Sequence, residues 1–390
     1  MNIKLFSNCI MILTLLIVNM TSCKFKDNEV QSTLAQKEHT KEIITDGLDT
    51  LVQTLMKNHK IPGVSIAFIN DRKLSESRNY GITDESSMNP INSETLFSVG
   101  SISKVVNAIV TLKLVELGDL NLDKNINNYL KDWKVDKNQF NSQNEVTLRH
   151  ILSHTAGFSV HGFEDYYPGD PLPTTLQILN GDKPAKNNKV ELILPVGHQY
   201  KYSGGGITII QKIIEDVTGM SYPNAVSKIL FEPMGLNRSI FKNPVPDTFQ
   251  NIAKAHNELG EPVALPRGYQ AMPEMAASGL WISTNDISTL LLNLMQTNKS
   301  SSSNYLSYNL INEMINQHEN SKHGLGPYIA FHEQHTKVMH YGSNESYKAI
   351  FTLFWEEGKG YIVFTNGSNG TKFIDELKPV FRQYLGIDEK

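Results

Sequence analysis

The stretch LFSVGSISKVVNAIVTLKLVELG, residues 96–118, decides the fold of this chain. An apolar segment of this length, closed by Gly118, predicts a buried helix whose first turn begins near Ser101. Ser101 and Lys104 are three residues apart, so the helix places both side chains on one face.

The spacing of Ser101 and Lys104 has a chemical use. A neutral amine is a base, whereas an ammonium ion is not. Burial and the positive end of the helix both disfavour the charged form, so we expect the pKa of Lys104 to fall toward neutral pH. Ser101 then has a proton acceptor, as an activated nucleophile requires. The S-x-x-K pattern alone does not establish a nucleophile, because it occurs twice in the chain. The second copy, Ser239 to Lys242, lies in a short strand or turn without a helix, and we interpret it as a chance occurrence.

Residues 1–22 have the pattern of an export signal, with Lys4 at the start and a short apolar core over residues 10–18. This core is too short to be a permanent membrane span. The segment MTSC, which ends at Cys23, resembles a bacterial lipobox, and the resemblance implies that Cys23 is lipidated. We therefore expect an exported lipoprotein of the cell envelope, on the periplasmic face or the outer surface, with a membrane anchor at Cys23.

Composition limits the remaining possibilities. The only other cysteine, Cys9, lies within the expected signal, so we predict no disulfide and a fold stabilised by its core. The formal net charge is -4, and loss of Lys4 with the signal makes it -5. This mild negative charge argues against nucleic acid as a partner. Residues 23–45 are polar and aperiodic, which is typical of a tether between membrane and domain.

A single domain is expected over residues 46–388. Alternating and β-branched runs predict strands over residues 64–69, 74–80, 338–341, 347–355 and 360–365. Helical periodicity predicts helices after residue 46 and over 147–157, 205–217, 223–231, 285–295 and 373–384. These elements predict an α+β, sandwich-like fold: a five-stranded antiparallel sheet flanked by N- and C-terminal helices. The sheet part would comprise 46–81 and 321–388, and a mostly helical part 82–320 would be inserted.

Two further segments strengthen the interpretation of Ser101. Tyr202, in the run YSG, lies on a turn that enters a predicted helix, and His340, in the run HYG, ends a predicted strand. The glycine of HYG, Gly342, would let a ligand lie close to the backbone. Phe163, Asp165, Tyr166 and Tyr167, in the long loop after residue 157, are candidates to line a pocket.

The three segments together resemble the serine β-lactamase and penicillin-binding protein superfamily, in the branch of class C β-lactamases, D-Ala-D-Ala carboxypeptidases, D-aminopeptidases and family VIII-type esterases. That family has S-x-x-K, Y-x-N, and K-T-G or H-x-G in this order. The runs LRHILSHTAG (148–157) and ASGLWIS (277–283) also resemble it, and the resemblance covers about residues 47–385.

The resemblance implies acyl transfer through a covalent intermediate on Ser101, without a metal or other cofactor. Lys104 and Tyr202 would share the proton transfers, and which of them is the general base stays open. The backbone N–H groups of Ser101 and Ser343 would form the oxyanion hole, because two donors must point at one developing charge. His340, Gly342 and Gly204 would contact the substrate, a small molecule or short peptide.

Two departures from the family motifs bear on the substrate. Gly204 replaces the asparagine of Y-x-N, and His340 replaces the lysine of K-T-G. A β-lactam or a peptide ending in D-alanine presents a carboxylate that needs a permanent cation, whereas histidine is near neutral at pH 7. The sequence therefore favours an ester, amide or amino-terminal D-peptide substrate over efficient β-lactam hydrolysis.

Several alternatives accompany this hypothesis. A binding or sensing module could keep the same fold and recognise wall peptide or β-lactam with little turnover. The segment from His332 to His335 contains metal-ligand residue types but lacks the helical H-E-x-x-H spacing, so we interpret it as a solvated turn. His154 is interpreted as a helix-capping or fold-bracing residue.

Overall fold

The computed structural model describes residues 47–242, 244–246, 249–263, 271–297, 305–332 and 335–387. The predicted signal, Cys23 and the tether lie outside these residues. Contacts divide the chain after Leu55 into two compact units, and the sheet and pocket described below belong to the larger one. A helix runs over residues 47–59. In the described ranges, none of the helices has both the length and the hydropathy of a membrane span.

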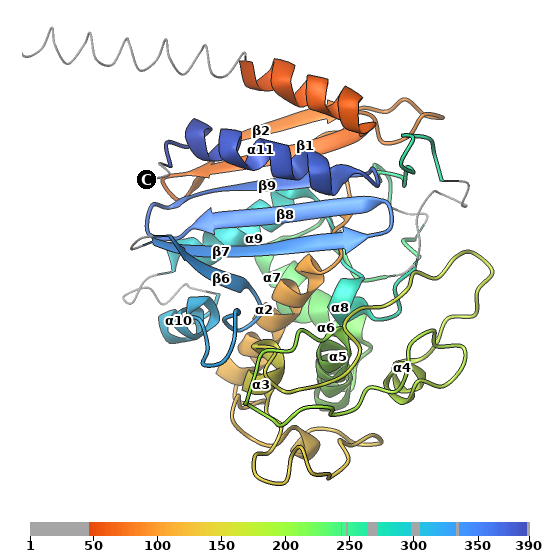
Figure 1. Ribbon diagram of the computed structural model, residues 1–390, viewed down its shortest axis with the longest axis vertical. Coiled ribbons are helices and arrows are strands. Elements are labelled where there is room, and N and C mark those ends of the chain that lie inside the picture. Colours follow the sequence, from red (N-terminus) through yellow and green to blue (C-terminus); the bar gives the residue numbers. More distant parts are fainter. Residues whose placement is uncertain are drawn as a thin grey trace, which may run out of the picture. The chain divides into compact units, whose positions relative to one another are not determined.

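A six-stranded antiparallel sheet in the order β2-β1-β9-β8-β7-β6 is the central element (Figure 1). Its strands are β1 (Gly63–Asn70), β2 (Lys73–Gly81), β6 (Tyr328–His332), β7 (His335–Asn344), β8 (Tyr347–Phe354) and β9 (Lys359–Thr365). The five predicted strands are present, and the two ends of the chain join where Val64 of β1 pairs with Thr365 of β9. The sixth strand, β6, was not predicted as part of the sheet; it is a five-residue strand held by a short hairpin to β7.

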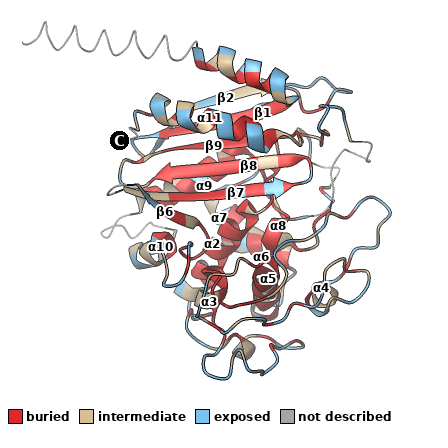
Figure 2. Cartoon of the chain, in the orientation of Figure 1, coloured by how far each residue is buried: buried red, intermediate tan, exposed pale blue. Residues whose placement is uncertain are grey.

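The central strands are covered on both faces (Figure 2). On one face lies α11 (Gly370–Tyr384), whose Phe381 ring is 5.2 Å from the rings of both Phe68 and Tyr361. On the other face lies α9 (Thr284–Gln296), which contacts β1 and β9 and is capped by Ser283. The Ser283 hydroxyl accepts the backbone N–H of Asp286 at 3.1 Å. Burial on both sides explains why these strands are almost continuously apolar.

Most of the helices come from the segment between β2 and β6. They are α2 (Ile102–Glu116), α3 (Leu148–Leu152), α4 (Thr175–Asn180), α5 (Gly204–Thr218), α6 (Tyr222–Val226), α7 (Glu232–Met234), α8 (Met275–Ser278), α9 and α10 (Tyr308–Ile315). The predicted helix over 223–231 is divided into α6 and a π-helical turn, Ser227–Phe231. The helix that begins at Ser101 is α2, and 12 of its 15 residues are buried, as its apolar composition predicts.

A small second sheet fixes the start of α2. It contains β3 (Phe97–Ser98), β5 (Trp281–Ile282) and β4 (Ser239–Ile240) in the order β3-β5-β4. Ser103 joins β5 to the helix, because its hydroxyl accepts the N–H of Leu280 at 3.0 Å and donates to the Gly100 carbonyl at 2.5 Å. The second S-x-x-K copy begins on β4, where the Ser239 hydroxyl donates to Asp286 at 2.8 Å.

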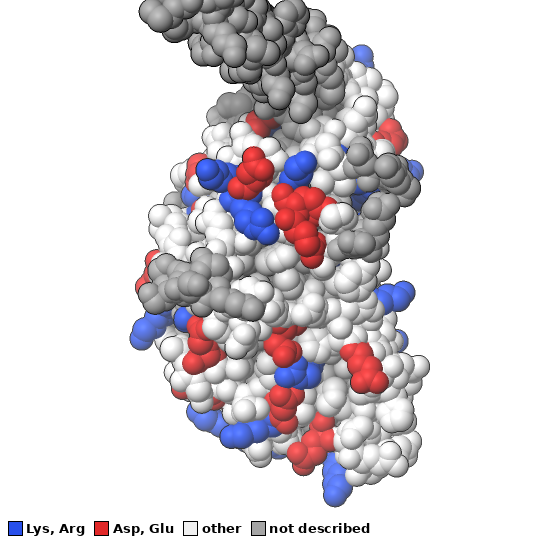
Figure 3. Space-filling view, turned by 90° about the vertical axis from the view of Figure 1, so that its left-hand side faces the viewer, with Lys and Arg blue, Asp and Glu red and all other residues white. Residues whose placement is uncertain are grey.

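Charged side chains of both signs are interspersed on the face drawn in Figure 3, over the described residues. This mixture accords with the small net charge of -4 for the whole chain.

Candidate active site

Ser101 and Lys104 meet at the start of α2, as their spacing predicts. The Nζ atom of Lys104 lies 2.9 Å from the Ser101 Oγ and donates to the Ala277 carbonyl of α8 at 2.7 Å. The short helix α8 is held in place by α5, where Gln211 Oε1 accepts the N–H of Ala276 at 3.0 Å. Burial lowers the pKa of Lys104 to about 7, so a neutral amine is available at physiological pH.

Tyr202 completes this group from the residues that precede α5. The Ser203 hydroxyl caps α5 by accepting the N–H of Gly206 at 3.0 Å, which fixes the chain at Tyr202. Burial raises the pKa of Tyr202 to about 12, while a side-chain hydrogen bond with Ser101 opposes the rise. The Lys104 Nζ lies 5.1 Å from the centroid of the Tyr202 ring. The hydroxyl and the amine at the start of α2 thus lie together with the phenol from the segment before α5. We call Ser101, Lys104 and Tyr202 the Ser101 corner.

Two glycines bring β7 against the turn before α2. Gly100 has φ +49°, and a Cβ atom on it would lie 2.6 Å from the Ser343 nitrogen. A Cβ atom on Gly342 would lie 1.8 Å from the Val99 carbonyl oxygen. This corrects the expectation that a ligand lies against Gly342, because the chain's own backbone fills that space. The same contact places the backbone of Ser343 beside the Gly100–Ser101 turn, where the predicted oxyanion hole requires it.

These groups face a pocket of about 730 Å³. Its lining combines the Ser101 corner with aromatic, imidazole and small polar side chains: Ser101, Lys104, His161, Gly162, Phe163, Tyr200, Lys201, Tyr202, Ser278, His323, Tyr328, His340, Tyr341, Ser343 and Asn344. Among the described residues, this lining contains no Asp or Glu, and its charged residue types are Lys104 and Lys201. The pocket therefore offers a nucleophile, a base and a largely uncharged aromatic wall.

His340 lies in the pocket, as predicted from the HYG run, and forms one wall of it with His323. Burial, together with the charges of His323 and Lys104, lowers the pKa of His340 to about 3. Burial also lowers the pKa of His323 to about 4. Both imidazoles are therefore neutral at physiological pH. We call His323 and His340 the histidine wall.

The Tyr202 ring is surrounded by imidazoles that the sequence did not assign to the site. The ring centroids of His154, His161 and His323 lie 4.3, 5.0 and 5.9 Å from that of Tyr202. His154 is buried, and its Nδ1 accepts the backbone N–H of Ser203 at 3.3 Å. Its contacts support the fold-bracing interpretation and show what it braces, the position of Tyr202. Single histidines in three different loops have no spacing signal that could have identified them.

Gly204 does not line the pocket but allows the long loop to lie on α5. A Cβ atom on Gly204 would lie 3.0 Å from Phe163 Cε2 and 3.1 Å from the His161 carbonyl oxygen. That carbonyl accepts the Gly204 N–H at 3.0 Å, and the Val160 carbonyl accepts the N–H of Gly205 at 3.0 Å. The space of the missing asparagine side chain is thus occupied by the loop.

The loop candidates have different places. Phe163 lines the pocket, whereas Tyr166 is buried and pairs through its backbone with Ala271. Asp165 accepts the backbone N–H of Glu345 at 3.3 Å, and the Tyr167 hydroxyl donates to the Glu345 carboxylate. The loop is therefore fastened to the turn between β7 and β8, at the edge of the pocket.

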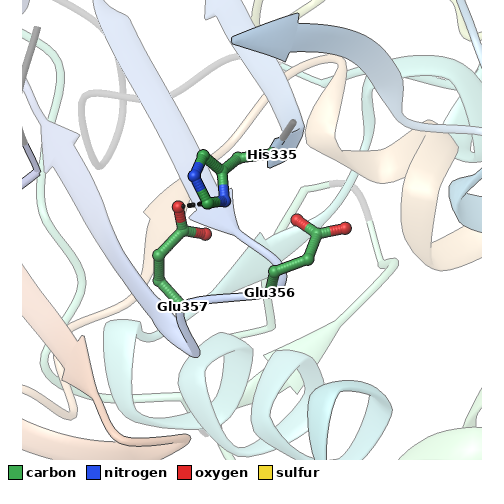
Figure 4. A group of neighbouring side chains, drawn as sticks. All are labelled: His335, Glu356 and Glu357. Carbon is green, nitrogen blue, oxygen red and sulfur yellow. Dashed lines mark ion pairs between the residues drawn. The ribbon is translucent and has the colours of Figure 1, made fainter. Parts of the chain in front are cut away.

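One group of side chains in the described residues has the composition of a metal site: His335, Glu356 and Glu357 (Figure 4). Their ligand atoms lie within 4.8 Å of one another, but they already have protein partners. His335 Nδ1 lies 2.7 Å from a Glu357 carboxylate oxygen, and Glu356 accepts from the backbone N–H and hydroxyl of Thr336 at 2.7 and 2.9 Å. We interpret the group as a set of polar contacts between β7 and the β8–β9 turn.

Comparison with known families and proteins gives consistent results. A family model described as "Beta-lactamase" matches residues 48–382. Protein flp of Staphylococcus aureus is 22% identical over 326 residues, which are 82% of this chain and 62% of that protein. Penicillin-binding protein 4 of Amycolatopsis lactamdurans is 27% identical over 207 residues, 53% of this chain and 51% of that protein. The matched region thus spans less than two thirds of these relatives.

Solved structures show the same fold. A beta-lactamase/D-alanine carboxypeptidase from Pseudomonas syringae has a TM-score of 0.66 and 22% identity, and covers 88% of this chain and 100% of its own. An octameric penicillin-binding protein homologue from Pyrococcus abyssi has a TM-score of 0.66 and 23% identity, and covers 83% of this chain and 74% of its own. At these identities the likeness establishes the fold.

Proposed function

Because the chain belongs to the beta-lactamase family, we propose that it is a serine hydrolase that forms an acyl intermediate on Ser101. We further propose that a lipid on Cys23 holds it to the cell envelope and that its substrate is an ester, an amide or a D-peptide. The observation that carries the enzymatic proposal is the 2.9 Å contact between Ser101 Oγ and the Nζ of Lys104, a buried lysine whose pKa is about 7.

The pKa values of the Ser101 corner support one division of the proton transfers between Lys104 and Tyr202. The neutral amine of Lys104 accepts the Ser101 proton as Oγ attacks the substrate carbonyl. The tetrahedral oxyanion is stabilised by the N–H groups of Ser101 and Ser343, each contributing about 3 kcal/mol. Tyr202, protonated below its pKa of about 12, donates to the leaving group and recovers a proton from Lys104. Water, deprotonated by the same amine, then hydrolyses the acyl ester and regenerates Ser101.

Two positions support the choice of substrate class. At Gly204 the loop residue Phe163 occupies the space of an amide side chain that would hold a peptide. At His340 the imidazole is neutral, so it offers no charge to a substrate carboxylate. Esters, simple amides and amino-terminal D-peptides do not need a carboxylate to be held there. We therefore place these substrates ahead of penicillins.

The test is labelling with a fluorophosphonate probe and turnover of p-nitrophenyl esters. We expect Ser101→Ala to lose labelling and at least about 1000-fold in kcat/KM, because the Ser101 hydroxyl is the one in contact with the Lys104 amine at 2.9 Å. The matched control is Ser239→Ala, which alters the other S-x-x-K copy on β4 and should keep both readouts. Equal labelling and turnover of wild-type protein and Ser101→Ala would refute the proposal. Cys23→Ala should move the protein from the membrane fraction to the soluble fraction.

The second candidate function is a binding or sensing protein for wall peptide or β-lactam. The same altered positions, Gly204 and His340, favour it, because weak alignment of a substrate can permit acylation of Ser101 without efficient deacylation. Intact-protein mass spectrometry separates the two functions. A sensor keeps the acyl adduct or forms none, whereas a hydrolase returns to its unmodified mass after the substrate is consumed.

A further inference from the structure

The histidine wall presents a hydrogen-bond acceptor to the pocket, whereas a cationic side chain in the same place would present donors. His340 Nδ1 lies 2.7 Å from the Tyr341 carbonyl oxygen. A carbonyl oxygen only accepts, so Nδ1 carries the imidazole proton and Nε2 has a free lone pair. His340 is 4% exposed, and Nε2 is buried without a hydrogen-bond partner among the described residues.

His323 shows how the protein satisfies such an atom elsewhere in the same wall. His323 Nδ1 donates to the Gly326 carbonyl at 2.9 Å, so its Nε2 is also an acceptor. The Tyr200 hydroxyl lies 3.3 Å from that atom and donates to it. Of two equivalent acceptors in one pocket wall, one is satisfied by the protein and the other is left for a ligand. Buried polar atoms are rarely left unsatisfied, because desolvation without a partner is unfavourable.

The charges around His340 restrict the kind of donor. An ammonium group of a ligand would find no Asp or Glu to pair with, because none of the described residues that line the pocket is acidic. A carboxylate would meet the lone pair of Nε2, which repels it. An uncharged N–H or O–H group fits both conditions.

Resting on the proposed acyl-serine hydrolase, we propose that His340 is a specificity-determining residue whose Nε2 accepts a hydrogen bond from an uncharged N–H or O–H group of the substrate. The site then selects neutral substrates that carry a carboxamide or hydroxyl group, and it discriminates against substrates that carry a carboxylate at that position. This is the reverse of recognition by a cationic side chain in the same place.

The experiment uses phenylboronic acids, which form reversible adducts with an activated serine. Three compounds differ only in one ring substituent, carbamoyl, methoxycarbonyl or carboxyl, and each is made in the meta and para series. Inhibition constants are measured as protection of Ser101 from the fluorophosphonate probe. In the series that reaches His340, we expect the carbamoyl compound to bind about tenfold tighter than the methyl ester, which lacks a donor, and the carboxyl compound to bind weakest.

Variants at His340 locate the effect. His340→Leu should make the carbamoyl and methyl ester compounds equal, and His340→Lys should make the carboxyl compound the tightest. His340→Gln, which keeps an acceptor, should preserve the preference for carbamoyl, and Ser239→Ala should match wild type throughout. Retained probe labelling shows that each variant is folded.

The results separate the two levels of the proposal. The role of His340 is overturned if wild-type protein gives equal inhibition constants for the three compounds in both series, including constants too weak to measure. It is also overturned if the carboxyl compound binds tightest. A carbamoyl preference that persists in His340→Leu also overturns it. Absence of probe labelling on wild-type Ser101 refutes the hydrolase itself. If a variant does not fold, the wild-type ranking still decides.

Discussion

The Ser101 corner and the histidine wall face the same pocket, and burial acts on a basic group in each of them. In the corner, burial lowers the pKa of Lys104 from 10.5 to about 7. In the wall, it lowers the pKa of His340 from 6.5 to about 3. One shift leaves a base that can take a proton near neutral pH, whereas the other leaves an imidazole too weakly basic to be protonated there. The same desolvation therefore makes one group suitable for proton transfer and the other for hydrogen-bond recognition.

The two regions also differ in whether their buried nitrogen atoms have hydrogen-bond partners within the protein. The Nζ of Lys104 has two protein partners, the Ser101 hydroxyl and the Ala277 carbonyl. The Nε2 of His340 has none among the described residues. The corner is preorganised before a ligand binds, whereas the wall is completed by the ligand. We infer that changes in the corner alter the rate for every substrate and that changes in the wall alter the choice among substrates.

Lys104→Met should give the largest effect and tests the corner. Removal of the base should reduce kcat/KM for p-nitrophenyl esters by about 1000-fold or more, because general base catalysis typically contributes about 10²–10⁴. The variant should nevertheless be more stable at pH 7. Lowering a lysine pKa from 10.5 to about 7 costs on the order of 4 kcal/mol at that pH, and the Ala277 carbonyl left without its donor costs only about 1–3 kcal/mol.

The pH dependence gives the sign of this stability change. Because the folded-state pKa of Lys104 lies below the unfolded one, its cost is greatest below about pH 7 and fades as the pH rises toward 10.5. The advantage of Lys104→Met should therefore shrink by on the order of 3 kcal/mol between pH 7 and about pH 9.5. Denaturant unfolding at both pH values measures it. If Lys104→Met were less stable than wild type by the same free energy of unfolding at both pH values, Lys104 would not be a buried neutral amine. The comparison with His340 would then fail.

Gly342→Ala should give the next largest effect and tests the junction between the two regions. The new Cβ atom would lie 1.8 Å from the Val99 carbonyl oxygen, so β7 must move away from the turn that carries Ser101. The Ser343 N–H then leaves the oxyanion position, and we expect a loss of about 100-fold in kcat/KM, as for one oxyanion donor. Overpacking should also lower stability by about 1–3 kcal/mol.

The control for Gly342→Ala is Gly118→Ala, after the end of α2. Gly118 has φ +84°, and none of the described residues lies within 4 Å of a Cβ atom placed on it, so the variant incurs backbone strain without a steric contact among them. It should lose about 1 kcal/mol of stability and keep its turnover. Equal turnover of Gly342→Ala and wild type would show that Ser343 and Ser101 need not be held together.

The difference between the two regions also explains what the sequence could predict. Ser101 and Lys104 are neighbours on one helix, so their contact follows from local geometry, and Tyr202 and His340 lie in motifs that resemble those of the family. The free lone pair of His340 depends on the Tyr341 carbonyl, and His323 arrives from an irregular segment with no periodicity. The first contact joins adjacent residues but depends on the side-chain rotamer of His340, and the position of His323 depends on tertiary packing. The spacing of residues in a single sequence encodes neither.

The fold shows the same division between local and tertiary information. The strands β1, β2, β7, β8 and β9 were predicted because β-branched and aromatic runs are bounded by turn residues. The strand β6 was not assigned to the sheet, since five residues carry little periodic signal and its pairing with β7 depends on the hairpin. Gly342 was expected to let a ligand lie close to the backbone, whereas the atom nearest to a Cβ at this position is the Val99 carbonyl oxygen.

Gly204→Asn should give the smallest effect and asks whether restoring the family asparagine restores its function. A side chain at this position meets Phe163 at 3.0 Å and the His161 carbonyl at 3.1 Å, so it must displace the loop. We expect kcat/KM for neutral esters to fall by about tenfold, since small displacements at a site cost substantial activity. Phe163→Ala removes one of the two obstacles, so the double variant should recover part of the loss that the single variant shows. A gain of activity in Gly204→Asn alone would mean that the loop moves aside at little cost in free energy. The activity of the site would then be limited by the missing amide side chain and not by the acceptor character of the histidine wall.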